Sequence, residues 1–285
     1  GVGDPPKFGV SKNLLERLGT YGKTRQEAEK DPYYEGRIDI SRDDVFDFLI
    51  RNLRDSMTDQ QKSDMLDQMA KVREVKEGEP VYKSVEGRGH YDRLNKRVYI
   101  PEPKKSSTIY RGSLESEEFI HAIQEIMNPR KLSDYGITEE NMQDFMPGGK
   151  EDLPNRYMPF MVVKTGEQIP LSLEVQQLID LNPEGISDDV YYGGSTPTET
   201  EAMLFSGLIH ANKMGVIPEG QTITEKDIPE ILNRFKALES RTSAILIPDH
   251  ARRLRRVLEN VQNLNPGSMD LLLKILNQDI TIQSQ

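Results

Sequence analysis

The run at residues 117–121, Glu-Glu-Phe-Ile-His, constrains this chain more than any other stretch of its sequence. Apolar residues around the run recur with helical spacing and predict a helix over 114–126. The predicted buried stripe of that helix is Phe119, Ala122, Ile123 and Ile126. On the same helix Glu117 and His121 lie one turn apart on another face, and Glu118 stands three residues before His121. Side chains at positions i and i+4 can reach one point in space, as two metal ligands on a helix must.

The bulk composition narrows the class of protein. With 285 residues the chain is long enough for one large domain or two modest ones. Charged residues make up 29%, so we expect a soluble protein, and the net charge of −10 argues against a non-specific nucleic-acid binder. No apolar run is long enough to predict a membrane span. The absence of cysteine excludes disulfides, thiolate zinc sites and cysteine nucleophiles. A start at Gly1 leaves both a matured precursor and an artificial start open.

Spacing and capping patterns predict mostly helical structure with a small sheet. We expect helices at 41–53, 58–75, 114–126, 171–181, 197–214, 225–238, 250–264 and 268–276, and strands at 80–85 and 97–100. Residues 91–96 read as a turn, 1–10 as an extended arm and 128–170 as irregular. The predicted buried stripe of the second helix is Met65, Leu66, Met69 and Val72. The elements group into an N-terminal arm and helical region (1–77), a core (78–215) and a C-terminal helical region (216–285).

Three segments follow an order that is found in a known class of enzymes. They are Asn95–Ile100, then Glu-Glu-Phe-Ile-His-Ala-Ile-Gln at 117–124, then Thr-Glu-Thr-Glu-Ala-Met at 198–203. In this order they resemble the zincin-type metallopeptidase domains of phage and toxin proteins, whose active helix typically reads His-Glu-x-x-His-x-x-Gln. The resemblance covers roughly residues 80–125 and 190–212. The chain departs from it at Glu117, where a zincin has its first histidine ligand.

The resemblance implies an α+β, zincin-like fold that is mostly helical, with a small sheet packed on the motif helix and its core at 78–215. By position, His121 and Glu199 would bind the metal, and Glu118 would be the general base. Glu117 would be a further ligand if its carboxylate takes the place of the missing histidine. Glu201 is the alternative third ligand, because the pattern leaves the register of the later helix open by two residues.

The exchange at Glu117 also changes the expected metal and function. One histidine with two carboxylates is a harder, more anionic set than two histidines with one, so it favours Mn or Fe relative to Zn and lowers the Lewis acidity of the ion. The implied function is a metallopeptidase-like protein with an altered motif, acting weakly on a peptide substrate or, as a pseudoenzyme, not at all. The alternative is a non-enzymatic component of a phage particle or of a secretion or injection assembly, virion-associated or secreted, with protein partners or copies of itself.

The remaining histidines and basic residues add no second metal motif. Half of the di-iron carboxylate signature, E-x-x-H, occurs at 118–121, and no second copy exists. His90 reads as a surface or turn residue and His250 as the start of a helix. His210 lies about 16 Å along its predicted helix from Glu199, which is too far to share an ion. The basic run at 251–256 reads either as a solvated helix face or as a contact for an anionic partner.

Overall fold

The computed structural model describes residues 42–53, 58–76, 78–79, 89–92, 96–100, 111–128, 138–141, 170–184, 197–241 and 249–279. The helices are α3 (Arg42–Leu53), α4 (Asp59–Ala70), α5 (Arg111–Met127), α7 (Leu173–Leu181), α8 (Pro197–Lys213), α9 (Ile228–Arg241), α10 (Asp249–Asn260) and α11 (Ser268–Leu276). The strands are β1 (Arg73–Glu74), β2 (His90–Asp92) and β3 (Arg97–Tyr99). Within these ranges the fold is α+β and mostly helical, as predicted.

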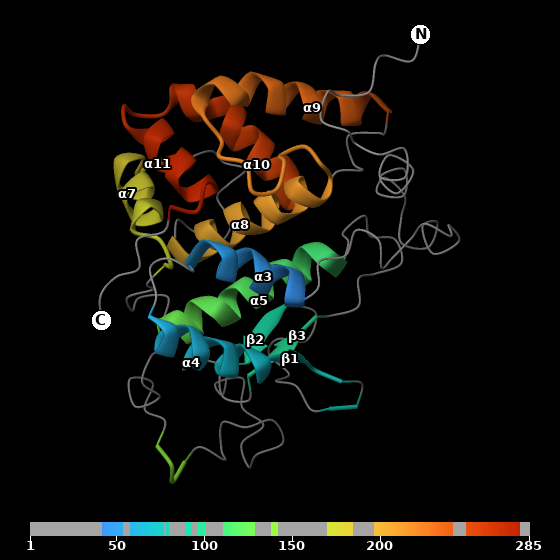
Figure 1. Cartoon of the computed structure of the whole chain (residues 1–285), viewed down its shortest axis with the longest axis vertical. Coiled ribbons are helices and arrows are strands. Elements are labelled where there is room, and N and C mark those ends of the chain that lie inside the picture. The colour runs from blue at the N-terminus through green and yellow to red at the C-terminus, as the bar shows by residue number, and fades with distance from the viewer. Residues whose placement is uncertain are drawn as a thin grey trace.

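Helix α8 runs through the middle of this arrangement. Figure 1 shows α3, α4, α5 and the sheet on one side of α8, and α9, α10 and α11 on the other. Every residue of α8 from Thr200 to Ala211 is buried, in keeping with packing on several sides. Its neighbours include α5 and α10, so α8 is the element that brings the motif helix and the C-terminal helices together.

The predicted helices are found with shifts at their ends. Those expected at 197–214 and 268–276 match α8 and α11 closely. A 3-10 turn at Glu225–Asp227 precedes α9, and another at Val261–Asn263 follows α10, so these two helices differ from their predicted bounds by a few residues. The expected arm at 1–10, the strand at 80–85 and most of the irregular stretch 128–170 lie outside the described residues.

The start of α4 was predicted correctly and its end was not. Thr58 and Gln61 form a capping box: Oγ1 of Thr58 accepts from the Gln61 N–H at 3.2 Å, and Oε1 of Gln61 accepts from the Thr58 N–H at 2.9 Å. The helix ends at Ala70 rather than at residue 75, because the chain enters β1 at Arg73 and pairs there with β3.

The predicted buried stripe of α4 is wrong at one position. Leu66 is 47% exposed, whereas Met65, Met69 and Val72 are buried. A helix places Leu66 about 100° around its axis from Met65. The buried side of α4 is centred on Met65 and Met69, and α4 packs against α5. Leu66 therefore lies at the edge of that contact and faces solvent.

The sheet is small and lies against the motif helix. Its strand order is β1-β3-β2, with β1 parallel and β2 antiparallel to β3. Tyr91 pairs with Val98, so the turn predicted at 91–96 is wrong at its first two residues, and His90 begins β2 rather than lying in a turn. Val98 in the central strand is fully buried, and both β2 and β3 contact α5. The predicted packing of a small sheet on this helix is confirmed.

One cluster of buried apolar side chains extends from α3 to α11. Its largest fully buried members include Phe119, Phe205 and Phe235. Phe46 meets the Phe119 ring edge-on, with 6.2 Å between ring centroids and an interplanar angle of 83°, so α3 is fixed against α5. All three predicted regions contribute to this cluster, and their division into domains stays a prediction. No helix in the described part of the chain is long and apolar enough to cross a membrane.

Candidate metal centre

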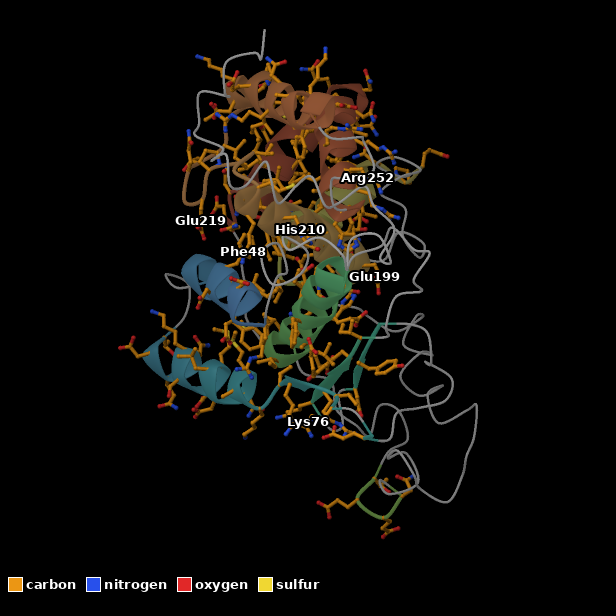
Figure 2. The ribbon with its side chains drawn as sticks, turned by 90° about the vertical axis from the view of Figure 1, so that its right-hand side faces the viewer. Phe48, Lys76, Glu199, His210, Glu219 and Arg252 are labelled. Carbon is orange, nitrogen blue, oxygen red and sulfur yellow. The ribbon has the colours of Figure 1, made fainter. Side chains whose placement is uncertain are left out.

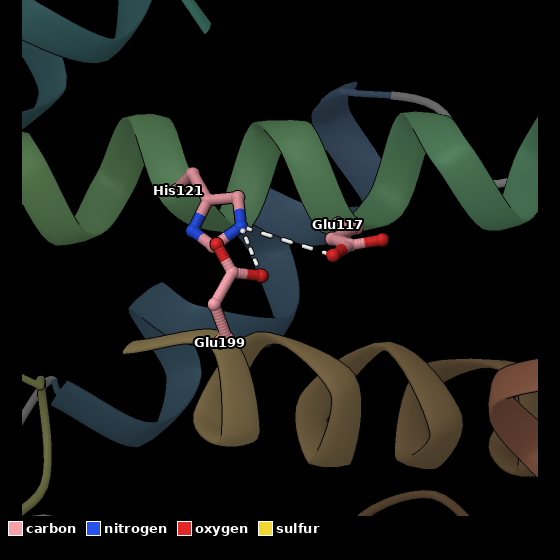
Figure 3. A group of neighbouring side chains, drawn as sticks. All are labelled: Glu117, His121 and Glu199. Atoms are coloured by element: carbon pink, nitrogen blue, oxygen red, sulfur yellow. Dashed lines mark ion pairs between the residues drawn. The ribbon is translucent and has the colours of Figure 1, made fainter. Parts of the chain in front are cut away.

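Glu117 and His121 from α5 meet Glu199 from the first turn of α8 (Figure 3). Nε2 of His121 lies 3.4 Å from Oε2 of Glu199 and 3.9 Å from Oε1 of Glu117. One ligand atom from each residue lies within 4.8 Å of the other two. The structure therefore brings together the three residues that the sequence suggested as metal ligands.

Helix geometry and helix packing place these side chains. Glu117 and His121 share one face of α5 because they are four residues apart. Glu199 is the third residue of α8, whose first residue is Pro197, a position at which proline sacrifices no helical hydrogen bond. In the first turn a carboxylate is also favoured by the helix dipole. Because α5 packs against α8, the two faces converge.

The centre is buried at one end and open at the other. The side-chain exposure rises from 8% at Glu117 to 19% at His121 and 32% at Glu199. Figure 2 shows Glu199 at one end of α8 and His210 farther along the same helix. His210 thus lies outside the group, as predicted. Glu199 and His121 are thus both in partial contact with solvent, whereas Glu117 is buried.

Gln124 fixes the orientation of the His121 ring. Oε1 of Gln124 lies 2.8 Å from Nδ1 of His121. Nε2 of Gln124 donates hydrogen bonds to the carbonyl oxygen of Thr198 (3.0 Å) and to Oε1 of Glu201 (2.9 Å), so its other end must be the acceptor. Nδ1 of His121 is therefore the donor, and Nε2 points toward the two carboxylates. This arrangement of a histidine and its orienting partner is typical of metal-ligating imidazoles.

Glu201, the alternative third ligand, has a different set of contacts. Its carboxylate accepts hydrogen bonds from the backbone N–H groups of Leu171 (2.7 Å) and Ser172 (2.8 Å) as well as from Gln124. Burial raises its pKa to about 7 in spite of these bonds. Glu201 is fully buried and holds the segment before α7 against α8. The register of α8 therefore brings Glu199, not Glu201, to the centre.

Glu118 lies beside the centre and against the backbone at Gly89. A Cβ atom at Gly89 would lie only 2.9 Å from Oε1 of Glu118, so a larger residue would displace the carboxyl group. Withdrawal from water raises the pKa of Glu118 to about 8, and the charges of Glu117 and Glu199 act in the same direction against the attraction of His121. In the metal-free protein Glu118 is therefore mostly protonated at neutral pH.

His250 is the residue that the sequence analysis did not connect to the centre. It is the second residue of α10, as a helix-start reading predicts, but its Nε2 lies 3.4 Å from Oε2 of Glu117. Its Nδ1 lies 2.6 Å from Oγ of Ser206, which lies 2.5 Å from Oγ of Ser116. Ser206-Gly207 is a small, partly polar pair within the otherwise apolar middle of α8, but it does not indicate which residue it contacts.

The charges of the centre depend on one another. Burial by itself raises the pKa of Glu117, but its interactions with His121 and His250 outweigh burial and hold the value at about 2. Burial by itself lowers the pKa of His121, but Glu199 and Glu117 outweigh it and raise the value well above its usual range. The two carboxylates thus favour positive charge at Nε2 of His121, which either a proton or a metal ion can supply.

The donor set fits a divalent cation. At bond lengths of about 2.0–2.1 Å, two ligands of a tetrahedral ion are roughly 3.3 Å apart. The distances of 3.4 and 3.9 Å from Nε2 of His121 to the two carboxylates are near this value, and all three ligand atoms lie within 4.8 Å of one another. One imidazole and two carboxylates also carry the charge that balances a divalent ion. The group supplies three donors, and two of them, His121 and Glu199, are partly exposed to solvent.

Comparison with known proteins returns no match for this chain among family models, curated proteins or solved structures. The described part of the chain is thus an α+β protein in which two helices bring together Glu and His side chains that could hold a metal ion. Any narrower assignment has to rest on the contacts within this centre.

Proposed function

We propose that this chain binds a divalent metal ion through Glu117, His121 and Glu199, as an altered form of the zincin-type metallopeptidase centre. The observation that carries this proposal is the orientation of His121. Gln124 accepts from Nδ1, so Nε2 faces two carboxylates that offer only acceptors. A bare nitrogen lone pair in that position would be repelled, and a cation at Nε2 removes the repulsion.

The three ligands and Glu118 have distinct tasks in this proposal. A bound divalent ion would polarise a carbonyl group and lower the pKa of a water molecule. Glu117 and Glu199 supply the negative charge that holds the ion, and His121 supplies the neutral donor. Glu118 is a carboxyl group beside the centre that can hold or release a proton, the task of a general base once it is ionised.

Peptidase activity is expected to be weak or absent. Two carboxylates donate more negative charge to the ion than one carboxylate with a second imidazole, so a water on it should be less acidic. Mn or Fe should be accepted alongside Zn, because oxygen donors favour harder ions. Peptide is the substrate class that the likeness to zincins implies, and a peptidase assay on the metal-loaded protein should therefore give low activity.

Elemental mass spectrometry of protein purified without chelator tests the metal site. We expect about one equivalent of Zn, Mn or Fe in the wild-type chain, and a loss of most of it in His121→Ala and Glu199→Ala. Glu125→Ala is the matched control, because Glu125 lies on α5 one turn beyond His121 and outside the group. It should keep its metal. A metal-free wild-type protein would refute the proposal.

A second function has its own supporting observation. His121 and His250 both lie at ion-pair distance from Glu117, and His121 also lies at that distance from Glu199, so these contacts can join α5, α8 and α10 without a metal ion. The chain would then serve as a non-enzymatic structural or assembly component. This alternative predicts no metal in any of the proteins by elemental mass spectrometry, and a loss of stability in His121→Ala by urea unfolding.

A further inference from the structure

We infer that His250, held by Ser206, is a positioning residue of the metal centre that fixes Glu117 as a ligand in the place of the motif's missing histidine. The inference rests on the proposed function, since it concerns how this same centre is held. It adds the C-terminal helix α10 to a site that the sequence motif confines to α5 and α8.

Glu117 lies between two imidazoles. Oε1 faces Nε2 of His121 at 3.9 Å, and Oε2 faces Nε2 of His250 at 3.4 Å. Each histidine therefore contacts a different oxygen of the same carboxylate. A glutamate side chain has three rotatable bonds and would otherwise sample many orientations. The contact with His250 selects the orientation in which Oε1 faces the centre.

Two buried serines fix His250 in turn. Nδ1 of His250 contacts Oγ of Ser206 at 2.6 Å, and Ser206 contacts Oγ of Ser116 at 2.5 Å. Both hydroxyl groups are fully buried, where an unpaired polar group would be costly. Because Ser116 directly precedes Glu117, the contacts close a ring: Ser116, Ser206, His250 and Glu117, on α5, α8, α10 and α5 again. This ring is the polar ring referred to below.

The backbone of α10 is also held at close range. A Cβ atom on Gly207 would lie 2.6 Å from the carbonyl oxygen of His250 and 3.0 Å from Cβ of Leu254. Only glycine allows α8 and α10 to approach this closely at that point. The backbone of His250 is thus fixed by packing and its ring by Ser206, so the imidazole reaches Glu117 in one orientation.

Glu117 has a flexible side chain and two carboxylate oxygens, so as a metal ligand it needs a partner, His250, that fixes its orientation. Residues that orient metal ligands typically change metal affinity by about 10- to 100-fold. In the usual case a carboxylate orients a ligating histidine; here a histidine orients a ligating carboxylate. His250 also keeps one oxygen of Glu117 away from the ion, which favours binding through the other oxygen alone.

The test measures metal affinity of the full chain by competition with a chelator, using Zn²⁺ and, for a spectrum, Co²⁺. We expect His250→Ala to weaken Zn²⁺ binding by about 10- to 100-fold and to change the visible spectrum of the Co²⁺ form. His250→Gln should restore most of the affinity, because the side-chain amide of glutamine can take the place of Nε2 of His250 against Oε2 of Glu117. His210→Gln is the matched control, since it alters another buried histidine outside the polar ring, and should bind as the wild type does.

Ser206→Ala provides a second route, should His250→Ala fail to fold. It leaves His250 in place but removes the partner of Nδ1, so we expect a smaller loss of affinity and a shifted Co²⁺ spectrum. Unchanged affinity and spectrum in Ser206→Ala and in every folded His250 variant, beside a metal-binding wild type, would overturn this inference and leave the proposed function standing. A wild type without metal affinity would overturn both.

Discussion

Glu117 differs from an ordinary helix glutamate in that each of its oxygens faces an imidazole. It is buried, and its pKa is nevertheless near 2, because burial is outweighed by the interactions with His121 and His250. Its neighbour Glu118 has the opposite behaviour, since its pKa is raised to about 8. Glu117 and Glu118 are adjacent on one helix but carry different charges at neutral pH. This difference in pKa suits Glu117 for holding a cation and Glu118 for exchanging a proton.

The raised pKa of Glu118 predicts how the stability of the metal-free protein depends on pH. The folded chain keeps a proton that the unfolded chain loses above its ordinary pKa of 4.5, so stability falls as pH rises from about 5 to about 8. Glu118→Gln removes this titration. In urea unfolding with chelator present, we expect the variant to lose less stability over that range, by on the order of 1–3 kcal/mol. Identical pH profiles would contradict a protonated Glu118.

His210 offers a prediction about a buried group outside the centre. It is 1% exposed, neither ring nitrogen has a hydrogen-bond partner among the residues that the structure describes, and burial lowers its pKa to about 3, with His250 and Lys213 acting in the same direction. Below about pH 6.5 His210 binds a proton in the unfolded chain but not in the folded chain. The free energy of unfolding therefore falls as the pH falls toward 3. The imidazole is therefore a source of acid sensitivity.

Leucine is close in size to histidine and has no polar atoms. His210→Leu should therefore raise the free energy of unfolding by about 1–3 kcal/mol at pH 7, and by more at pH 5. Chemical denaturation at the two pH values measures both effects. A variant that is less stable than the wild type at both pH values would mean that the imidazole has a favourable role in the fold.

Helices α5, α8 and α10 act together through the polar ring and through close backbone packing. Ser116 and Glu117 on α5, Ser206 on α8 and His250 on α10 are all buried. Gly207, one residue after Ser206, brings the α8 backbone against that of α10. The same point of contact thus serves packing and the centre, so a change in the spacing of these helices should affect both.

Gly207→Ala tests this coupling. The new Cβ would lie 2.6 Å from the carbonyl oxygen of His250, so α10 must shift. Alanine favours a helix over glycine by up to about 1 kcal/mol, but the steric cost is larger, and we expect a net loss of about 1–3 kcal/mol in the free energy of unfolding. Thermal and urea unfolding measure it. Equal or greater stability would show that the two backbones are not in such close contact.

At the level of the whole fold, local patterns predicted the elements better than they predicted their neighbours. Helical spacing identified α5, α8 and α11, and the i, i+4 relation of Glu117 to His121 followed from it directly. The end of α4 was missed because Arg73–Glu74 forms a strand only through pairing with β3, a long-range contact that periodicity does not record. Leu66 was wrongly predicted to be buried, because the spacing of apolar residues gives the direction of the core but not the width of the contact.

Some residues of the candidate site could be predicted from the sequence, and others could not. The pairing of Glu117 with His121 could be predicted because they lie four residues apart on one helix, whereas Glu199 was assigned to the same site only through the resemblance to zincins. His250 could not be predicted, because its contact with Glu117 depends on how α10 packs against α8, and no spacing along the chain encodes that packing. The choice between Glu199 and Glu201 likewise depended on contacts of the segment before α7. Helix-to-helix placement is therefore where the structure adds most.

Anomalous X-ray diffraction from crystals grown with Zn²⁺ or Mn²⁺ tests the metal centre most directly, because it locates the ion itself. We expect a strong peak at roughly 2.0–2.2 Å from Nε2 of His121 and from a carboxylate oxygen of each of Glu117 and Glu199. Oε2 of Glu117 should remain against His250. A well-ordered centre with no anomalous peak, or a peak held only by other residues, would contradict the assignment of these three side chains as metal ligands.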